Sequence, residues 1–175
     1  MKHFDAGRAR KGFTLVELVV VVVVLGVLSA LALPRLLNFG SDARASKVTA
    51  LTGSIREAAQ IIHSKAIVQV TDSAATGTVT ADGASINTVY GYPDANDGLA
   101  SGGSGGANGI VAAVNVTAAG DNLTISYAAG TTTFAVQGAV TAATCGVTYS
   151  NATATVSGPT TTVTPPAIVA TTSGC

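Results

Sequence analysis

A run of 21 residues, Phe13–Leu33, contains one charged side chain, Glu17, and is otherwise almost entirely apolar. At a helical rise of about 1.5 Å per residue it is roughly 30 Å long, which matches the hydrocarbon core of a bilayer. The apolar part of a cleaved secretory signal is usually about 7–15 residues long and ends at a small-x-small site. Ser29–Ala32 imitates such a site, so ordinary signal cleavage stays open, but the length favours a membrane anchor.

Charged residues are distributed very unevenly along the chain. Residues 1–12 carry a net charge of +3, whereas residues 66–175 carry five aspartates and no Lys, Arg, Glu or His. Positive charge ahead of the apolar run keeps that end in the cytoplasm, so we expect residues 66–175 to be exported. The exported part has no basic side chain to neutralise phosphates, which argues against a nucleic-acid partner. Acid–base catalysis would rest on scattered aspartates, so we expect no enzyme, no cofactor and no metal site.

Glu17 is unusual because an ionisable group in a membrane segment is costly. In one interpretation it is a tolerated charge close to the lipid headgroups. In the other it meets a positive partner when helices pack together.

The segment from Lys11 to Glu17, KGFTLVE, and the apolar run behind it resemble the class III signal of type IV prepilins and related pseudopilins. The resemblance covers roughly 25 of the 175 residues. It implies cleavage between Gly12 and Phe13 by a membrane-embedded prepilin peptidase, followed by N-methylation of Phe13. It also implies that Glu17, the fifth residue of the mature chain, pairs with the terminal amine of a neighbouring subunit.

Beyond Leu33, apolar residues recur at spacings of three and four, which indicates one face of an amphipathic helix. We therefore expect one long helix from Phe13 to about Lys65. The expected apolar stripe consists of Val48, Leu51, Ile55, either Ala58 or Ala59, Ile62 and Ala66.

This long helix has weak points. Pro34 removes a helical hydrogen bond, and Gly26 costs about 1 kcal/mol relative to alanine. In an isolated subunit these residues predict a fixed kink. The resemblance to type IV pilins implies more, namely that the segment from Gly26 to Pro34 loses helical hydrogen bonding in the filament. Gly40–Asp42 is a second weak point, where Ser41 or Asp42 could cap a restarted helix.

The exported part is rich in Thr, Val and Gly, which favour strands and turns. Alternation at 123–127 and 133–136, separated by Ala-Ala-Gly, predicts a β-hairpin. Ile110–Val116 is predicted as an earlier strand, and Cys145–Tyr149 and Thr153–Val156 as later ones. An antiparallel sheet on the second half of the helix would bury the apolar stripe. This predicts an α+β fold, the architecture that the resemblance to type IV pilins implies.

Cys145 and Cys175 are the only cysteines, and both lie in the exported part. An even number outside the cytoplasm favours a disulfide, worth roughly 3.5 kcal/mol for a loop of this length. It would enclose Asn151–Gly174, which we expect to be extended and irregular. Such a carboxy-terminal loop is frequent in type IV pilins and generally absent from major pseudopilins.

Four remaining features also lead to expectations. His63 is expected to be a partly exposed helix residue rather than a metal ligand. The glycine-rich segment 97–109 is expected to be a surface loop, and the oxygen-rich segment 94–98 lacks the spacing of an EF-hand calcium site. Tyr90-Gly91-Tyr92-Pro93 resembles the mannose-sensitive haemagglutinin subgroup of type IV pilins.

The expected organisation is therefore a leader at 1–12, a transmembrane and filament-core helix at 13–33, an amphipathic helix at 34–65 and a Thr-rich β-sheet head at 66–175. The resemblance implies a single-pass inner-membrane precursor that becomes a subunit of an extracellular pilus used for attachment. Its implied partners are copies of itself in a helical filament, prepilin peptidase, and an assembly platform with its ATPase. Two alternatives stay open: a pseudopilin of a type II secretion system, and a membrane-anchored binding domain that does not polymerise.

Overall fold

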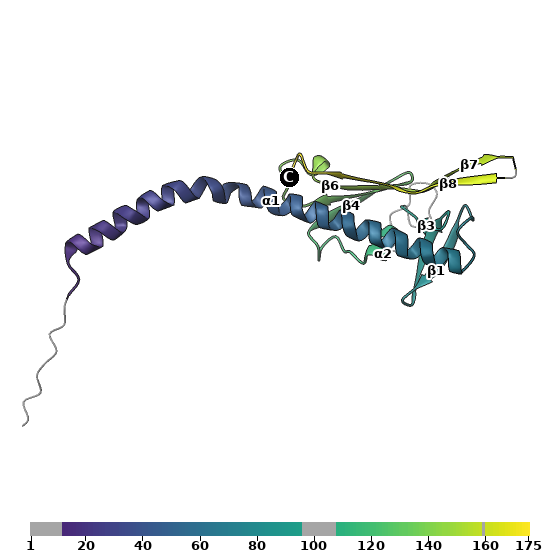
Figure 1. Cartoon of the computed structure of the whole chain (residues 1–175), viewed down its shortest axis with the longest axis horizontal. Helices are drawn as coiled ribbons and strands as arrows, with labels where there is room; N and C mark the ends of the chain where they lie inside the picture. Colours follow the sequence, from purple (N-terminus) through teal and green to yellow (C-terminus); the bar gives the residue numbers. More distant parts are fainter. Residues whose placement is uncertain (1–11, 96–107, 159) are drawn as a thin grey trace, which may run out of the picture. The chain divides into compact units, whose positions relative to one another are not determined.

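The computed structural model describes residues 12–95, 108–158 and 160–175, apart from the side chains of residues 33–38 (Figure 1). The chain divides into one unit that ends at Gly40 and a second from Ser41 to Cys175. All of the predicted leader except Gly12 lies outside the described residues, as do most of the glycine-rich segment and residues 96–98 of the oxygen-rich segment.

Helix α1 runs from Leu15 to Val68, close to the predicted bounds. It passes through Gly40–Asp42 without interruption, so the predicted restart at Ser41 or Asp42 is wrong. The helix ends in a Schellman motif, in which the amide of Thr71 donates to the carbonyl of Ala66 at 2.9 Å. Val70 occupies the left-handed position of this motif, with φ of 57°.

The second unit buries the predicted stripe of α1. Every member of the stripe, from Val48 to Ala66, is buried. Most of the stripe packs against a four-stranded antiparallel sheet in the order β4-β5-β6-β9, around Phe134 and Tyr149. Its strands are β4 (Leu123–Ala128), β5 (Thr131–Val136), β6 (Gly146–Ser150) and β9 (Ala167–Thr171), with the 3₁₀ turn η1 (Ala142–Thr144) between β5 and β6.

The predicted hairpin is confirmed, because β4 and β5 pair antiparallel with Leu123 opposite Val136. The later strands are also confirmed, as β6 and as β7 (Thr153–Ser157). The architecture is α+β, as predicted.

A second sheet, absent from the sequence prediction, covers the end of α1. It consists of β1 (Gly77–Ala81), β2 (Ala84–Val89) and β3 (Tyr92–Pro93), and it buries Val79 and Ile86 against Ile62 and Ala66. Asp82 and Gly83 connect β1 to β2 with φ of 49° and 82°. Positive φ at both residues defines a type I′ turn, for which Asp-Gly is a favoured sequence.

The predicted strand at Ile110–Val116 is wrong. Residues 110–114 form a short helix, α2 (Ile110–Val114), closed by Asn115 in a left-handed conformation. Ile110 and Val111 are both buried. Adjacent residues of a strand point to opposite faces, whereas a helical turn directs neighbouring apolar side chains to one side.

The segment enclosed by the cysteines is more regular than predicted. It contains β7, β8 (Thr160–Thr164) and β9. The β7–β8 pairs, such as Thr153 with Thr164, continue the register of the β6–β9 pairs, such as Ser150 with Ala167. The four strands therefore form one long hairpin, whose ladder stops where the two prolines at 165 and 166, which have no amide hydrogen, oppose residues 151 and 152.

Candidate processing and assembly site

The predicted cleavage junction lies in exposed, non-helical chain. Gly12 and Phe13 lie just ahead of Thr14, the residue before α1, and the Phe13 side chain is 88% exposed. A peptidase needs a reachable, non-helical backbone, and this junction is both non-helical and exposed in the described chain.

Thr14 and Glu17 form a capping box at the start of α1. The Thr14 amide and hydroxyl both donate to Glu17 Oε2 at 2.9 Å, and the Glu17 amide donates to Thr14 Oγ1 at 3.3 Å. These bonds satisfy amides that the first turn of a helix leaves without partners. Sequence reasoning missed this role of Glu17, although the pattern Thr-x-x-Glu ahead of an apolar run is its usual signal.

The helix segment behind the capping box is apolar and exposed. Leu15–Ala32 is long and apolar enough to cross a membrane, and none of it is buried. A Cβ added to Gly26 would meet no atom within 4 Å, so packing within this chain does not require glycine there. Pro34 lies inside the continuous helix.

The disulfide between Cys145 and Cys175 is present, and both residues are buried. Arg44 of α1 donates from Nε to the carbonyl oxygen of Cys175 at 2.6 Å. Backbone hydrogen bonds between Gly174 and residues 141 and 144 close the same corner. The disulfide and these hydrogen bonds together hold the segment after β9 against both the sheet and the helix.

His63 lies in a more specific environment than predicted. Its ring stacks on Tyr92 with 3.9 Å between centroids and 6° between planes. Its Nδ1 is buried and has no hydrogen-bond partner among the described residues. Among the described residues, no group of three or more His, Cys, Asp or Glu side chains gathers in one place.

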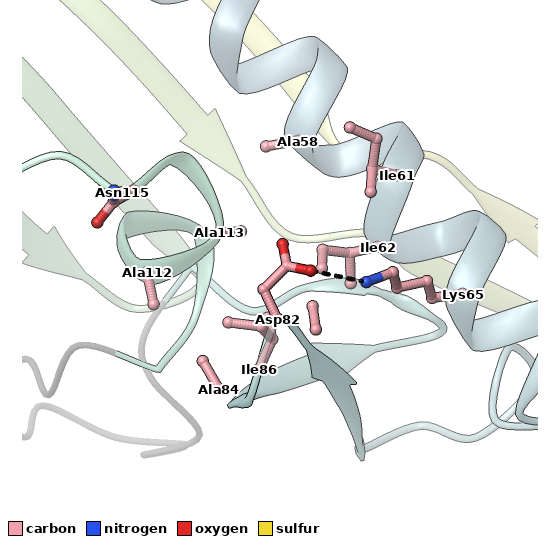
Figure 2. A pocket seen from close by; sticks show the side chains of 11 residues that line it. Ala58, Ile61, Ile62, Lys65, Asp82, Ala84, Ile86, Ala112, Ala113 and Asn115 are labelled. Atoms are coloured by element: carbon pink, nitrogen blue, oxygen red, sulfur yellow. Dashed lines mark ion pairs between the residues drawn. The ribbon is translucent and has the colours of Figure 1, made fainter.

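A pocket of about 360 Å³ lies in the second unit between α1, the β1–β2 hairpin and α2 (Figure 2). Alanine and isoleucine side chains form most of its lining, and Lys65 Nζ lies 3.8 Å from Asp82 Oδ1 at its rim. The Asp82 side chain is fully exposed, so this ion pair contributes little to stability. The lining holds no other titratable side chain and no hydroxyl nucleophile.

Residues 7–33 match the family model described as the prokaryotic N-terminal methylation motif. The chain is 43% identical to the type IV major fimbrial protein FimA of Dichelobacter nodosus over 49 residues, which are 28% of this chain and 31% of that protein. It is 34% identical to the fimbrial protein EcpC of Eikenella corrodens over 83 residues, 47% and 54% of the two chains. It is 42% identical to the type IV narrow pilus major component PilA5 of Thermus thermophilus over 48 residues, 27% and 41%.

The match thus spans between about a third and a half of each relative. No solved structure matches the chain. None of these relatives is named as a mannose-sensitive haemagglutinin pilin, so that subgroup stays a prediction. The chain therefore combines an N-terminal methylation motif, an apolar helix directly behind it and an α+β architecture, and over part of its length it is similar to proteins named as type IV fimbrial and pilus components.

Proposed function

We propose that this chain is a structural subunit, not an enzyme, of a type IV pilus used for attachment. The observation that carries the proposal is the exposed helix segment Leu15–Ala32, which is apolar over most of its length and contains no buried residue in the described part of the chain. Such a surface needs an apolar environment. The inner membrane supplies it before assembly, and the helices of neighbouring subunits supply it in the filament.

Prepilin peptidase would cleave between Gly12 and Phe13, and a methyl group would be added to the new amine. The exposed, non-helical junction supports this step. Cleavage removes the basic leader, which keeps the amino-terminal end of the precursor in the cytoplasm. An assembly ATPase, acting through a platform protein, would then move the subunit from the membrane into the filament.

Glu17 would set the register between neighbouring helices. Its capping bonds use Oε2, while Oε1 has no hydrogen-bond partner among the described residues. Oε1 can therefore accept a hydrogen bond from the Phe13 amine of a neighbour while the helix stays capped. In a bundle of helices with a low dielectric constant, the Glu17 carboxylate and the Phe13 ammonium of a neighbour attract each other strongly. The relative position of two helices that pairs these charges is therefore more stable than any position that separates them.

The segment from Gly26 to Pro34 would lose helical hydrogen bonds in the filament. In the subunit it is helical, and Pro34 cannot donate the usual amide hydrogen bond to the carbonyl four residues earlier. Gly26 adds backbone freedom without a packing contact in this chain. A filament map with continuous helix through both residues would contradict this proposal.

Mass spectrometry of filaments sheared from the cell surface tests the proposed function. We expect mature chains that begin with N-methylated Phe13 and contain the disulfide. Absence of the chain from sheared filaments, together with retention of exoproteins in the periplasm of a deletion strain, would instead indicate a pseudopilin. A mature chain found only in the membrane would indicate an anchored domain that does not polymerise.

Two substitutions separate the assembly role of Glu17 from its capping role. Glu17→Ala removes both, and we expect normal cleavage but loss of most filaments. Thr14→Val removes the capping hydroxyl, at a cost of about 1 kcal/mol, and leaves the carboxylate in place. We expect this variant to form filaments, and an equal loss in both variants would show that Glu17 acts only through the helix cap.

A further inference from the structure

Strands β7 and β8 form an exposed arm of the second unit. This arm, residues 153–164, continues the ribbon beyond β6 (Figure 1). Eight of its ten strand residues are exposed. In the described part of the chain, β7 and β8 pair only with each other, so each has one unpaired edge.

The register shows which backbone groups form these edges. Ser157, the last residue of β7, pairs with Thr160, the first residue of β8, so the connection between the two strands is two residues long. The residues flanking such a connection form a hydrogen-bonded pair, and hydrogen-bonded and non-hydrogen-bonded pairs then alternate along the ladder. The amides and carbonyls of Ala154 and Val156 therefore point outward from β7, and those of Thr161 and Val163 point outward from β8.

Proteins usually protect an unpaired edge with charged side chains, proline or a bulge. No charged residue follows Asp121 in the sequence, so neither edge of the arm carries a charge. The edge of β8 continues into Pro165 and Pro166, which block further pairing, whereas β7 contains no proline. Val156, one of the outward-pointing residues of β7, is 71% exposed.

We propose that the outer edge of β7 pairs with an edge strand of a second copy of this chain in the filament. This inference rests on the proposed function, because polymerisation places copies of the chain side by side. An uncharged edge carries no repulsion against an identical chain, whose four-stranded sheet offers two outer strands, β4 and β9. A two-stranded ribbon alone is marginally stable in water, so a third strand stabilises the arm. Pairing of two different edges is also the heterologous contact that an open helical filament requires.

Amide hydrogen exchange of the full mature chain tests this contact by comparing detergent-solubilised monomer with sheared filaments. We expect the amides of Ala154 and Val156 to exchange rapidly in the monomer and to slow at least about tenfold in the filament. The amides of Thr161 and Val163 are the internal control and should exchange rapidly in both. Rapid exchange of Ala154 and Val156 in intact filaments would overturn the inference while leaving the proposed function in place. Protection already present in the monomer would also overturn it, because the edge would then be covered within one chain.

A matched pair of substitutions gives a second measurement. Val156→Pro and Thr161→Pro each remove one outward amide and leave the ladder between β7 and β8 intact. We expect Val156→Pro to lower filament yield several-fold and Thr161→Pro to leave it unchanged. Equal yields in the two variants would overturn the assignment to β7. If the unmodified chain forms no filaments at all, the proposed function fails, and this inference fails with it.

Discussion

The side chain of Asn151 joins the connection after β6 to the connection after β3. Its Nδ2 donates to Asp94 Oδ1 at 2.9 Å, and its Oδ1 accepts from the amide of Ala95 at 2.6 Å. Asp94 is a buried carboxylate, 6% exposed, that lies 57 residues from Asn151 in the sequence. Tyr149 reinforces the same junction, because its hydroxyl donates to the carbonyl of Pro93 at 2.7 Å.

Replacement of Asn151 should therefore destabilise the second unit. Asn151→Ala removes a donor to a buried carboxylate, and we expect a loss of about 2–3 kcal/mol in the free energy of unfolding. The chain has no tryptophan, and all four tyrosines lie between residues 90 and 149, so tyrosine fluorescence during urea unfolding in detergent reports on this unit. Ser126→Ala, at an exposed position of β4, is the control. Equal unfolding midpoints for the two variants would contradict the role assigned to Asn151.

Stability should fall at alkaline pH because of Tyr149. Burial, with smaller contributions from Asp94 and Tyr92, raises the pKa of the Tyr149 hydroxyl above its ordinary value of about 10. The unfolded state then loses its proton first, so the stabilisation is complete below about pH 10 and declines above it by about 1.4 kcal/mol per pH unit. Urea unfolding of the wild type and of Tyr149→Phe between pH 8 and pH 11 isolates this component. We expect a shallower decline for the variant, and parallel curves would argue against a shifted Tyr149.

Gly91 should tolerate no side chain. Its φ is 77°, and a Cβ would lie 2.7 Å from Asp72 Cα and 3.1 Å from His63 Nδ1. Gly83 is the matched control, because its φ is 82° but a Cβ there would meet no atom within 4 Å. We expect Gly83→Ala to cost about 1 kcal/mol, for backbone conformation alone, and Gly91→Ala to cost about 3 kcal/mol or more. Unfolding midpoints in urea compare the two, and similar costs would show that the space around Gly91 adjusts readily.

The disulfide should stabilise the second unit mainly because the loop that it closes restricts the unfolded chain. Cys145 and Cys175 are 30 residues apart, and the chain-entropy relation gives roughly 3.5 kcal/mol for a loop of this size. We expect the Cys145→Ser, Cys175→Ser double variant to lose about this free energy, measured by urea unfolding. A loss below about 1 kcal/mol would mean that the hydrogen bonds of Arg44 and Gly174 hold the segment after β9 without the covalent bond.

The amphipathic half of α1 and the β4–β5 hairpin could be predicted because their signals are local. The stripe from Val48 to Ala66 repeats with the helical period, and the residues of β4 and β5 alternate as those of strands do. The apolar segment from residue 13 to residue 33 was equally clear, since its length and uniform character need no tertiary contact to interpret. The capping box of Thr14 and Glu17 was also local in origin, and a search for Thr-x-x-Glu would have found it.

The secondary structure of some short segments could not be predicted, because tertiary contacts rather than local sequence signals select it. Residues 110–114 are too few and too uniformly apolar to show a period, and their burial against the rest of the second unit selects a helix. Strands β8 and β9 are recognisable only through their pairing with β7 and β6, because Thr-rich sequence next to two prolines is also compatible with irregular chain.

The sequence by itself therefore determined the motif around Gly12 and Phe13, the apolar helix with Glu17, and the face by which the second half of α1 enters the core. Tertiary structure alone decided that His63 stacks on Tyr92, that Asn151 holds Asp94, and that an uncharged β7 edge is left unpaired in the described part of the chain. The physical reason is distance along the chain. Helical periodicity and capping act between residues three or four apart, whereas these contacts join residues tens of positions apart, which only the folded backbone brings together.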